Sequence, residues 1–199
     1  MTYRKMLMFC ALGILSVFIV TVANATLINL NDFYADPTVT VASDGSSAQM
    51  IEDPNLILVL LSNDPGLGDP NVIIPGLGVA LNFNYNFVEG NNSDDEFGVF
   101  VIDSDTGLPV GPDFEFYTPS TDSGNVSFDL SSLAGKTLGL QFQLSSFSGD
   151  ADFDSLVTVS NVQLQESTPI PEPSTILLLT TGLVSIVGYA GIRFHRKKQ

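Results

Sequence analysis

The stretch Val79-Ala-Leu-Asn-Phe-Asn-Tyr-Asn-Phe-Val88 decides the fold class of this chain. Large apolar side chains occupy every second position, and asparagines fill most of the positions between them. Successive side chains of an extended strand point to opposite faces, so this stretch presents one apolar face and one amide face. It predicts a β-strand whose sheet packs one side on a core and turns the other toward solvent.

The same period of two recurs on both sides of this stretch. Leu138–Leu144 alternates in the same way, and Phe97–Ile102 is apolar on both faces, which predicts burial on both sides. Near the end of the region, Val157 and Val159 are out of phase with Val162 and Leu164. A β-bulge near Ser160-Asn161 would bring both pairs to the same face.

The whole region from Thr26 to Gln165 has this character. No helical periodicity of useful length interrupts it, and turn signals such as Asp44-Gly45 and Thr106-Gly107 separate the apolar segments. We expect eight or nine antiparallel strands arranged as a two-sheet sandwich, an all-β fold. We assign this exported domain to residues 26–165.

The charge distribution restricts the partners of this domain. The chain has 199 residues and a net charge of −15, yet its mean hydropathy is +0.28. Every acidic residue except Glu172 lies between Thr26 and Ile170, where Lys136 is the single basic residue. Such a surface repels phosphate backbones, which excludes nucleic-acid binding, and it repels acidic polysaccharides unless a divalent cation bridges them.

The residue types that are absent from this region exclude further functions. Residues 26–170 contain no His, Cys or Trp, since Cys10 and His195 lie near the chain ends. Nucleophiles activated by histidine, metal sites built from thiolates or imidazoles, and disulfides are therefore excluded.

The N-terminal segment has the features of a secretory signal. Arg4 and Lys5 precede the uncharged run Met6–Val22, and Ala23-Asn24-Ala25 is a small-x-small site of the kind that signal peptidase accepts. We expect residues 1–25 to be removed. The alternative is an uncleaved anchor, because 17 residues just reach the length of a membrane span.

The C-terminal segment predicts a single transmembrane helix. After a linker over residues 166–173, the uncharged stretch Ser174–Ile192 is long enough to span about 28 Å as a helix. Basic residues follow it in the tail, residues 193–199: Arg193, Arg196, Lys197 and Lys198. The positive-inside rule places this tail in the cytoplasm and the acidic domain outside.

The order of these parts resembles the PEP-CTERM sorting signal of exopolysaccharide-producing bacteria. Pro171, Glu172 and Pro173 match its tripeptide, Ser174–Ile192 its membrane span and the basic residues its stop-transfer cluster. The resemblance implies recognition by exosortase, anchoring in the inner membrane of a Gram-negative bacterium, and transfer to the cell surface or extracellular matrix. The alternative is a plain tail anchor behind a proline linker.

A second resemblance concerns the exported domain. The segment Phe128–Thr137, the strand after it and the closing Asp154–Val162 segment are similar to the C-terminal half of jelly-roll carbohydrate-binding modules. This resemblance implies a jelly-roll-like sandwich. The same fold hosts lectins, structural domains and enzymes, so it does not select among them.

Calcium is the cofactor that the acidic residues suggest. Asp150, Asp152 and Asp154 have the spacing of the first three ligands of a calcium loop, and Asp103 with Asp105 forms a second partial match. The resemblance to jelly rolls, in which a structural calcium joins an N-terminal loop to the final strand, further implies Asp154 with Asp32 or Glu52. The alternative for each cluster is a solvated acidic loop.

Sugar binding is possible even without tryptophan. Tyr34, Tyr85 and Tyr117 could stack on a pyranose ring, although Tyr85 is in phase with the buried positions. Amides at Asn82, Asn84 and Asn86, together with Gln141 and Gln143, could hydrogen-bond hydroxyl groups. The alternative is that these amides line the solvent face of an ordinary sheet.

These observations predict a surface or matrix protein without catalytic activity, associated with extracellular polysaccharide. Two alternatives stay open at this point. One is a dedicated lectin-like module. The other is a glycoside hydrolase that uses the aspartate triplet as its carboxylate pair, which the lack of tryptophan for sugar stacking disfavours.

Overall fold

A computed structural model describes residues 24–64, 73–90, 94–146 and 153–166 of the chain. Several sequence predictions lie outside these residues and stay predictions. They concern most of the signal segment, Asp150, Asp152, the sorting tripeptide, the membrane span and the basic tail. Within the described residues, no helix is long and apolar enough to cross a membrane.

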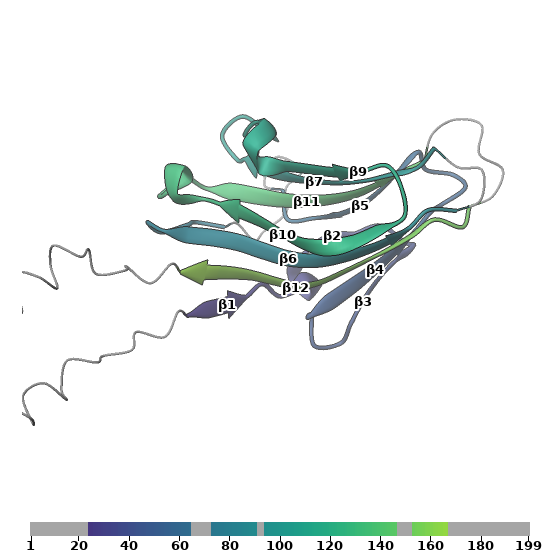
Figure 1. Cartoon of the computed structure of the whole chain (residues 1–199), viewed down its shortest axis with the longest axis horizontal. Helices are drawn as coiled ribbons and strands as arrows, with labels where there is room; N and C mark the ends of the chain where they lie inside the picture. Colours follow the sequence, from purple (N-terminus) through teal and green to yellow (C-terminus); the bar gives the residue numbers. More distant parts are fainter. Residues whose placement is uncertain (1–23, 65–72, 91–93, 147–152, 167–199) are drawn as a thin grey trace, which may run out of the picture. The chain divides into compact units, whose positions relative to one another are not determined.

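The described residues form two six-stranded sheets whose pairings are antiparallel (Figure 1). Sheet A runs in the order β10 (Asp122–Asp129), β6 (Val79–Val88), β12 (Leu156–Glu166), β4 (Ser47–Ile51) and β3 (Val39–Val41), and β1 (Ala25–Leu27) also pairs with β12. Sheet B runs in the order β2 (Tyr34–Ala35), β5 (Leu58–Ser62), β11 (Leu138–Ser145), β7 (Glu96–Asp103) and β8 (Leu108–Pro109), and β9 (Glu115–Thr118) also pairs with β7.

The expected all-β, two-sheet sandwich is therefore confirmed. The expected strand count was too low, because β1, β2 and β8 have only two or three residues each and are too short to show a periodicity. Among the described residues, three short 3-10 helices that the sequence did not predict lie in connections: η1 (Leu30–Asp32), η3 (Pro112–Phe114) and η4 (Ser131–Leu133).

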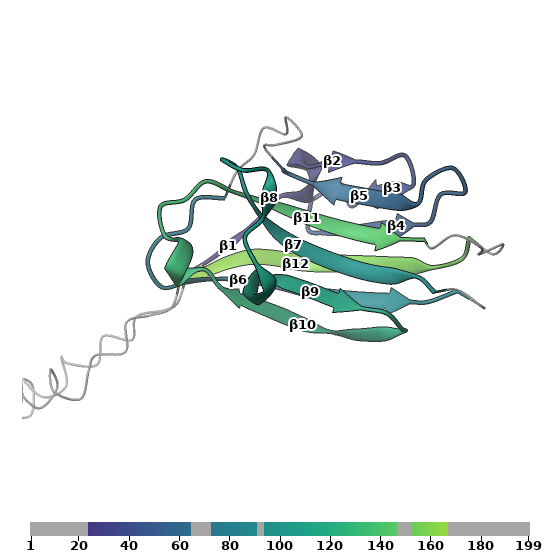
Figure 2. The same ribbon diagram turned by 90° about the horizontal axis from the view of Figure 1, so that it is seen from above.

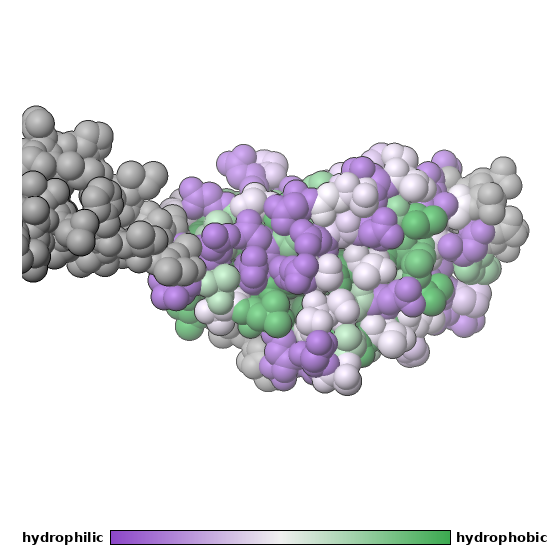
Figure 3. All heavy atoms as spheres, turned by 60° about the horizontal axis from the view of Figure 1, so that its bottom comes forward, coloured by the Kyte–Doolittle hydropathy of each residue, from purple (hydrophilic) through white to green (hydrophobic). Residues whose placement is uncertain are grey.

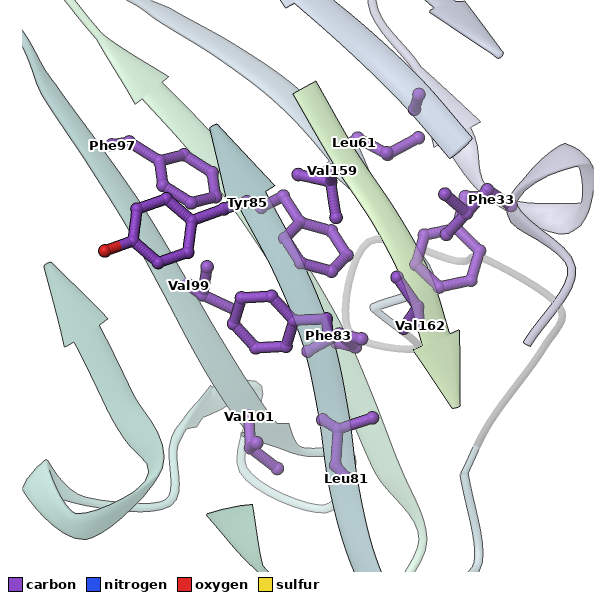
Figure 4. Close-up of a cluster of buried hydrophobic side chains, with 14 of the residues drawn as sticks. Phe33, Leu61, Leu81, Phe83, Tyr85, Phe97, Val99, Val101, Val159 and Val162 are labelled. Atoms are coloured by element: carbon purple, nitrogen blue, oxygen red, sulfur yellow. The ribbon is translucent and has the colours of Figure 1, made fainter. Parts of the chain in front are cut away.

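The core lies between the inner faces of the two sheets (Figure 4). Leu81, Phe83 and Phe87 of β6 are fully buried, as the alternation predicted, and Tyr85 is buried with them. Phe83 packs edge-on against Phe142 of β11, with ring centroids 5.5 Å apart. Burial of these large rings supplies much of the apolar contact that joins the sheets.

β7 is buried on both faces, which confirms the prediction from its unbroken apolar run. Phe97, Val99 and Val101 point into the core. Phe100 and Ile102 are buried as well but do not belong to the core cluster, because they lie on the outer face of sheet B.

The predicted bulge in β12 is also confirmed. The pairing of β12 with β6 shifts register between Ser160 and Gln163, and Asn161 has a φ of 53°, in the left-handed region. The extra residue reverses the alternation, so Val162 points to the same buried side as Val159.

Three connections gather at one end of the sandwich. The last residue of β4, Ile51, and the last residue of β6, Val88, both lie opposite Leu156, the first residue of β12. In sheet B, the last residue of β11, Ser145, lies opposite the first residues of β5 and β7. The β4–β5, β6–β7 and β11–β12 connections therefore meet there, and we call this the loop end.

Candidate functional site

Two carboxylates are buried side by side at the loop end. Glu52 directly follows β4 and is 3% exposed, and Asp95 directly precedes β7 and is fully buried. Burial of an ionised carboxylate is costly unless it is paired and hydrogen-bonded. This pair therefore needs a compensating group.

Ser155, fully buried just before β12, joins the two carboxylates. Its backbone N–H donates to Glu52 Oε2 over 2.8 Å, and its hydroxyl donates to Asp95 Oδ2 over 2.5 Å. The Gly90 N–H in turn donates to the Ser155 hydroxyl over 2.7 Å. Four residues from three connections thus form one hydrogen-bonded cluster, which we call the carboxylate cluster: Glu52, Gly90, Asp95 and Ser155.

Among the residues that the structure describes, one oxygen of each carboxylate in this cluster has no hydrogen-bond partner. Glu52 Oε1 and Asp95 Oδ1 are both buried and unsatisfied. Burial raises the pKa of Glu52, and the nearby Asp95 adds to this, while the Ser155 amide and the Ser146 hydroxyl act in the opposite direction. The net direction is a raised pKa, which favours the protonated form of Glu52.

No side chain of the domain can supply the missing positive charge. Lys136 is the single basic residue between Thr26 and Ile170, and its Nζ lies 3.1 Å from Asp103 Oδ2. Only a proton or a bound cation can therefore neutralise the pair. Within the residues that the structure describes, no three side chains of the His, Cys, Asp and Glu types are grouped as a metal site, so carbonyl oxygens or water would have to complete a cation's shell.

The predicted calcium ligand Asp154 borders the carboxylate cluster. Its Oδ1 lies so close to Gly90 that a Cβ added to this glycine would stand 1.7 Å from it. A side chain at position 90 would therefore have to displace the Asp154 carboxylate. Asp32 lies elsewhere: η1 is bonded through Leu30 to Gly45, before the start of β4, whereas Glu52 follows the end of that strand.

Asp103 and Asp105 lie at the other end of the sandwich, at the end of β7. Asp103 accepts from the Asp105 amide over 2.9 Å through one oxygen and from Lys136 through the other. These two donors lower the pKa of Asp103. β7 separates this turn from Asp95 by about 25 Å, so Asp103 and Asp105 lie far from the carboxylate cluster that Asp154 borders.

The predicted sugar-binding residues divide between the two outer faces. Asn82, Asn84 and Asn86 are on the outer face of sheet A, where Asn86 lies in register with Thr158 and then Gln49. Figure 3 views the domain from this side and shows hydrophilic side chains over much of it. Tyr85 is on the inner side of the same strand, and it donates to Asp122 over 2.6 Å.

Tyr34 and Tyr117 are on the outer face of sheet B, together with Gln141 and Gln143. They are 49% and 47% exposed and lie on β2 and β9, at opposite edges of the sheet (Figure 2). Partial burial and the adjacent Glu115 and Glu96 raise the pKa of Tyr117. The tyrosines and the asparagines therefore cannot form one site.

Sequence reasoning missed Asp95 and Ser155 as members of the carboxylate cluster, because neither belongs to a motif. They come together only through the pairing of strands that are distant in the chain, which no local pattern records.

Comparison with known proteins gives neither a matching family model nor a matching curated protein. Among solved structures, the secreted serine protease VesC from Vibrio cholerae is similar with a TM-score of 0.40 and 16% identity, over 70% of this chain and 27% of that one. The Endo-D glycoside hydrolase domain from Streptococcus pneumoniae R6 has a TM-score of 0.39 and 14% identity, over 74% of this chain and 22% of that one. The enzymatically active domain of tailspike protein 4 from bacteriophage CBA120 has a TM-score of 0.34 and 12% identity, over 73% of this chain and 18% of that one. The chain thus spans less than a third of each of these chains.

Proposed function

We propose that this chain is an exported protein that exosortase, after signal peptidase, sorts to the cell surface or extracellular matrix of a Gram-negative bacterium. Its domain would act there without catalysis, as a calcium-stabilised sandwich associated with extracellular polysaccharide. The observation that carries the proposal is one chain that joins an acidic β-sandwich to Pro171-Glu172-Pro173, an apolar span and a basic tail.

We infer a jelly-roll topology from the strand order. The eight main strands, numbered first to eighth along the chain, are β4, β5, β6, β7, β9, β10, β11 and β12. In sheet A they lie side by side in the order sixth, third, eighth and first. They occupy sheet B in the order second, seventh, fourth and fifth. This order is that of two interleaved Greek keys, the arrangement of a jelly roll.

The carboxylate cluster supports the calcium part of the proposal. Glu52 Oε1 and Asp95 Oδ1 are buried oxygens without donors, and oxygen is the ligand atom that Ca²⁺ prefers. A bound Ca²⁺ would neutralise both carboxylates and tie together the three connections of the loop end. The aspartates 150, 152 and 154 stay candidates from their spacing alone.

Burial supports the non-catalytic part of the proposal. Two carboxylates with different environments are the arrangement that glycoside hydrolysis needs. Among the described residues, Glu52 and Asp95 are two carboxylates that lie close together, and their burial closes both to a sugar chain. The aspartate triplet of the hydrolase alternative lies mostly outside the described residues. No specific observation favours the hydrolase alternative.

The sorting step is tested with the Glu172→Ala variant in a host that has exosortase. We expect the variant to stay unprocessed in the inner membrane, because the substitution removes the acidic residue of the recognised tripeptide. Glu166→Ala, a few residues earlier, is the matched control and should be processed as the wild type. Normal processing of Glu172→Ala would exclude sorting through this signal.

A further inference from the structure

The outer face of sheet B carries two adjacent cross-strand rows of side chains. The first row contains, in register, Tyr34, Ser62, Gln141, Phe100 and Glu115. The second contains Leu60, Gln143, Gly98 and Tyr117, and Asp36 continues it beyond Leu60 through a bond from its N–H to the Leu60 carbonyl. A tyrosine and a carboxylate therefore stand at each edge of the sheet. Between them Ser62, Gln141 and Phe100 are buried, so the accessible path follows the second row, where Gln143 is the partly exposed amide.

Each of the two tyrosines is held by the carboxylate two residues away. The Tyr34 hydroxyl donates to Asp36 Oδ1 over 2.8 Å, and the other oxygen of Asp36 accepts from the Leu60 amide over 2.8 Å. The Tyr117 hydroxyl donates to Glu115 Oε2 over 3.2 Å. Rings that are about half exposed are thus fixed in orientation before any ligand arrives, which lowers the entropic cost of stacking on them.

Gly98 has no side chain to fill the space beside the Tyr117 ring. A Cβ at this position would stand 3.1 Å from the Phe100 ring and 3.5 Å from the Tyr117 ring. Tyr117 packs edge-on against Phe100 with centroids 5.2 Å apart, so its ring has apolar support on the side of the sheet. Four strand spacings separate β2 from β9, which places the two tyrosines about 19 Å apart.

The negative charge of this face favours neutral glycans over acidic glycans. Asp36, Glu96 and Glu115 lie on or beside it, and the single lysine of the domain is committed to Asp103. Carboxylates accept hydrogen bonds from sugar hydroxyls, but they repel uronic acids and sulfated sugars.

We propose that the outer face of sheet B binds a neutral glycan chain that crosses the strands from Tyr34 to Tyr117. The two rings stack on sugar units near the ends of the bound segment, and Gln143, Asp36 and Glu115 accept or donate bonds to hydroxyls. This inference rests on the proposed glycan-associated role and assigns its face and its ligand class.

The asparagine face of sheet A lacks these features. Asn84 Oδ1 accepts from Asn125 over 3.0 Å, and Asn82 donates to Gln165 over 3.3 Å, so these amides partly satisfy one another. The described positions of this outer face include no aromatic ring on which a sugar could stack. It therefore serves as the internal comparison for the proposal.

The test uses the purified full chain in a zwitterionic detergent without a sugar headgroup. Its Kd is measured by calorimetry for neutral linear hexasaccharides of glucose, mannose, xylose and galactose, and for an oligogalacturonate of equal length, all in the presence of chelator. Tyr34→Ala and Tyr117→Ala should each raise the Kd for the bound neutral chain about tenfold, because each removes a stacking contact. Tyr34→Phe keeps the ring and should change it less, and Gln49→Ala on sheet A is the control that leaves it unchanged.

The outcomes separate this inference from the proposed function. If neutral chains bind but Asn84→Ala weakens them and the tyrosine variants do not, the face is wrong and glycan association stands. If the oligogalacturonate binds better than every neutral chain, the ligand class is wrong. If no glycan binds the folded wild type, either in chelator or after calcium is added, both the inference and the glycan-associated role are overturned.

Discussion

Both ends of the sandwich contain carboxylates, but the two ends differ in how these groups are buried and hydrogen-bonded. At the loop end, Glu52 and Asp95 are buried, and each has one oxygen without a donor. At the other end, both oxygens of Asp103 accept hydrogen bonds from protein groups, one from the Asp105 amide and one from Lys136. Among the described residues, two buried oxygens at the first end have no donor, whereas both oxygens of Asp103 at the second end accept hydrogen bonds.

This difference separates acidic residues that are candidates for binding a cation from acidic residues that only stabilise a turn. The spacing of Asp103 and Asp105 attracts attention in the sequence, yet it produces a turn in which one side chain caps the backbone. Glu52 and Asp95 are 43 positions apart and form no motif. Burial without a donor, rather than density of charge along the chain, marks the candidate site.

Removal of calcium should have the largest effect on the stability of the domain. We expect chelator to destabilise the wild-type protein by about 3 kcal/mol, or about 10 °C in Tm, because two buried carboxylates lose their counter-ion. Differential scanning calorimetry with calcium and with chelator measures the shift. An identical melt in both conditions would remove the cation from the loop end.

The Glu52→Gln variant should change stability in opposite directions in the two conditions. With calcium it loses a ligand and is less stable than the wild type by about 2 kcal/mol. With chelator it removes one of two like charges that are buried together, and it should be more stable than the wild type by about 1 kcal/mol. The same sign in both conditions would contradict the interpretation of the pair.

The pH dependence of stability in chelator should distinguish the buried carboxyl of Glu52 from the carboxyl of Asp103. The native pKa of Glu52 is raised above its ordinary value of 4.5, so its protonated form stabilises the folded state. Stability should therefore rise as the pH falls from neutral through this native pKa toward 4.5. Below that range it should fall again, because the carboxyl of Asp103 has a lowered pKa and must be protonated.

Chemical denaturation from pH 7 to below pH 3.8, the ordinary pKa of Asp103, checks this profile. Glu52→Gln should lack the rise on the acidic side and keep the fall at lower pH, since Asp103 is unchanged in it. A variant profile that matches the wild type would assign the rise to other groups.

Asp103→Asn should have the smallest effect. Its ion pair with Lys136 is partly exposed to solvent, and such pairs contribute little to stability and less at high salt. We expect a small decrease in Tm that is equal with calcium and with chelator. A calcium-dependent decrease would show that this end also binds a cation.

Much of the fold could be predicted because it depends on local periodicity. The alternation in Val79–Val88 fixed its buried and solvent faces, and the phase change before Val162 indicated the bulge at Asn161. Of the short strands, Val39–Val41 was predicted as β3, but β1, β2 and β8 were not, since β2 and β8 pair through backbone groups with little support from their own side chains.

The candidate sites were predicted less completely. The sequence nominated Tyr34, Tyr117 and the asparagines together, but it could not place them on different sheets, because the sheet of a strand depends on pairing partners far away in the chain. Asp95 and Ser155 acquire their role only when the β6–β7 and β11–β12 connections meet.

The sequence by itself determined the all-β class, the acidity of the domain and the absence of any internal cation except Lys136, since these follow from residue types and their spacing. Only the tertiary structure decided which carboxylates are buried together and which tyrosines share a face. The physical reason is that desolvation and cross-strand register arise between segments distant in the chain, and no local pattern records them.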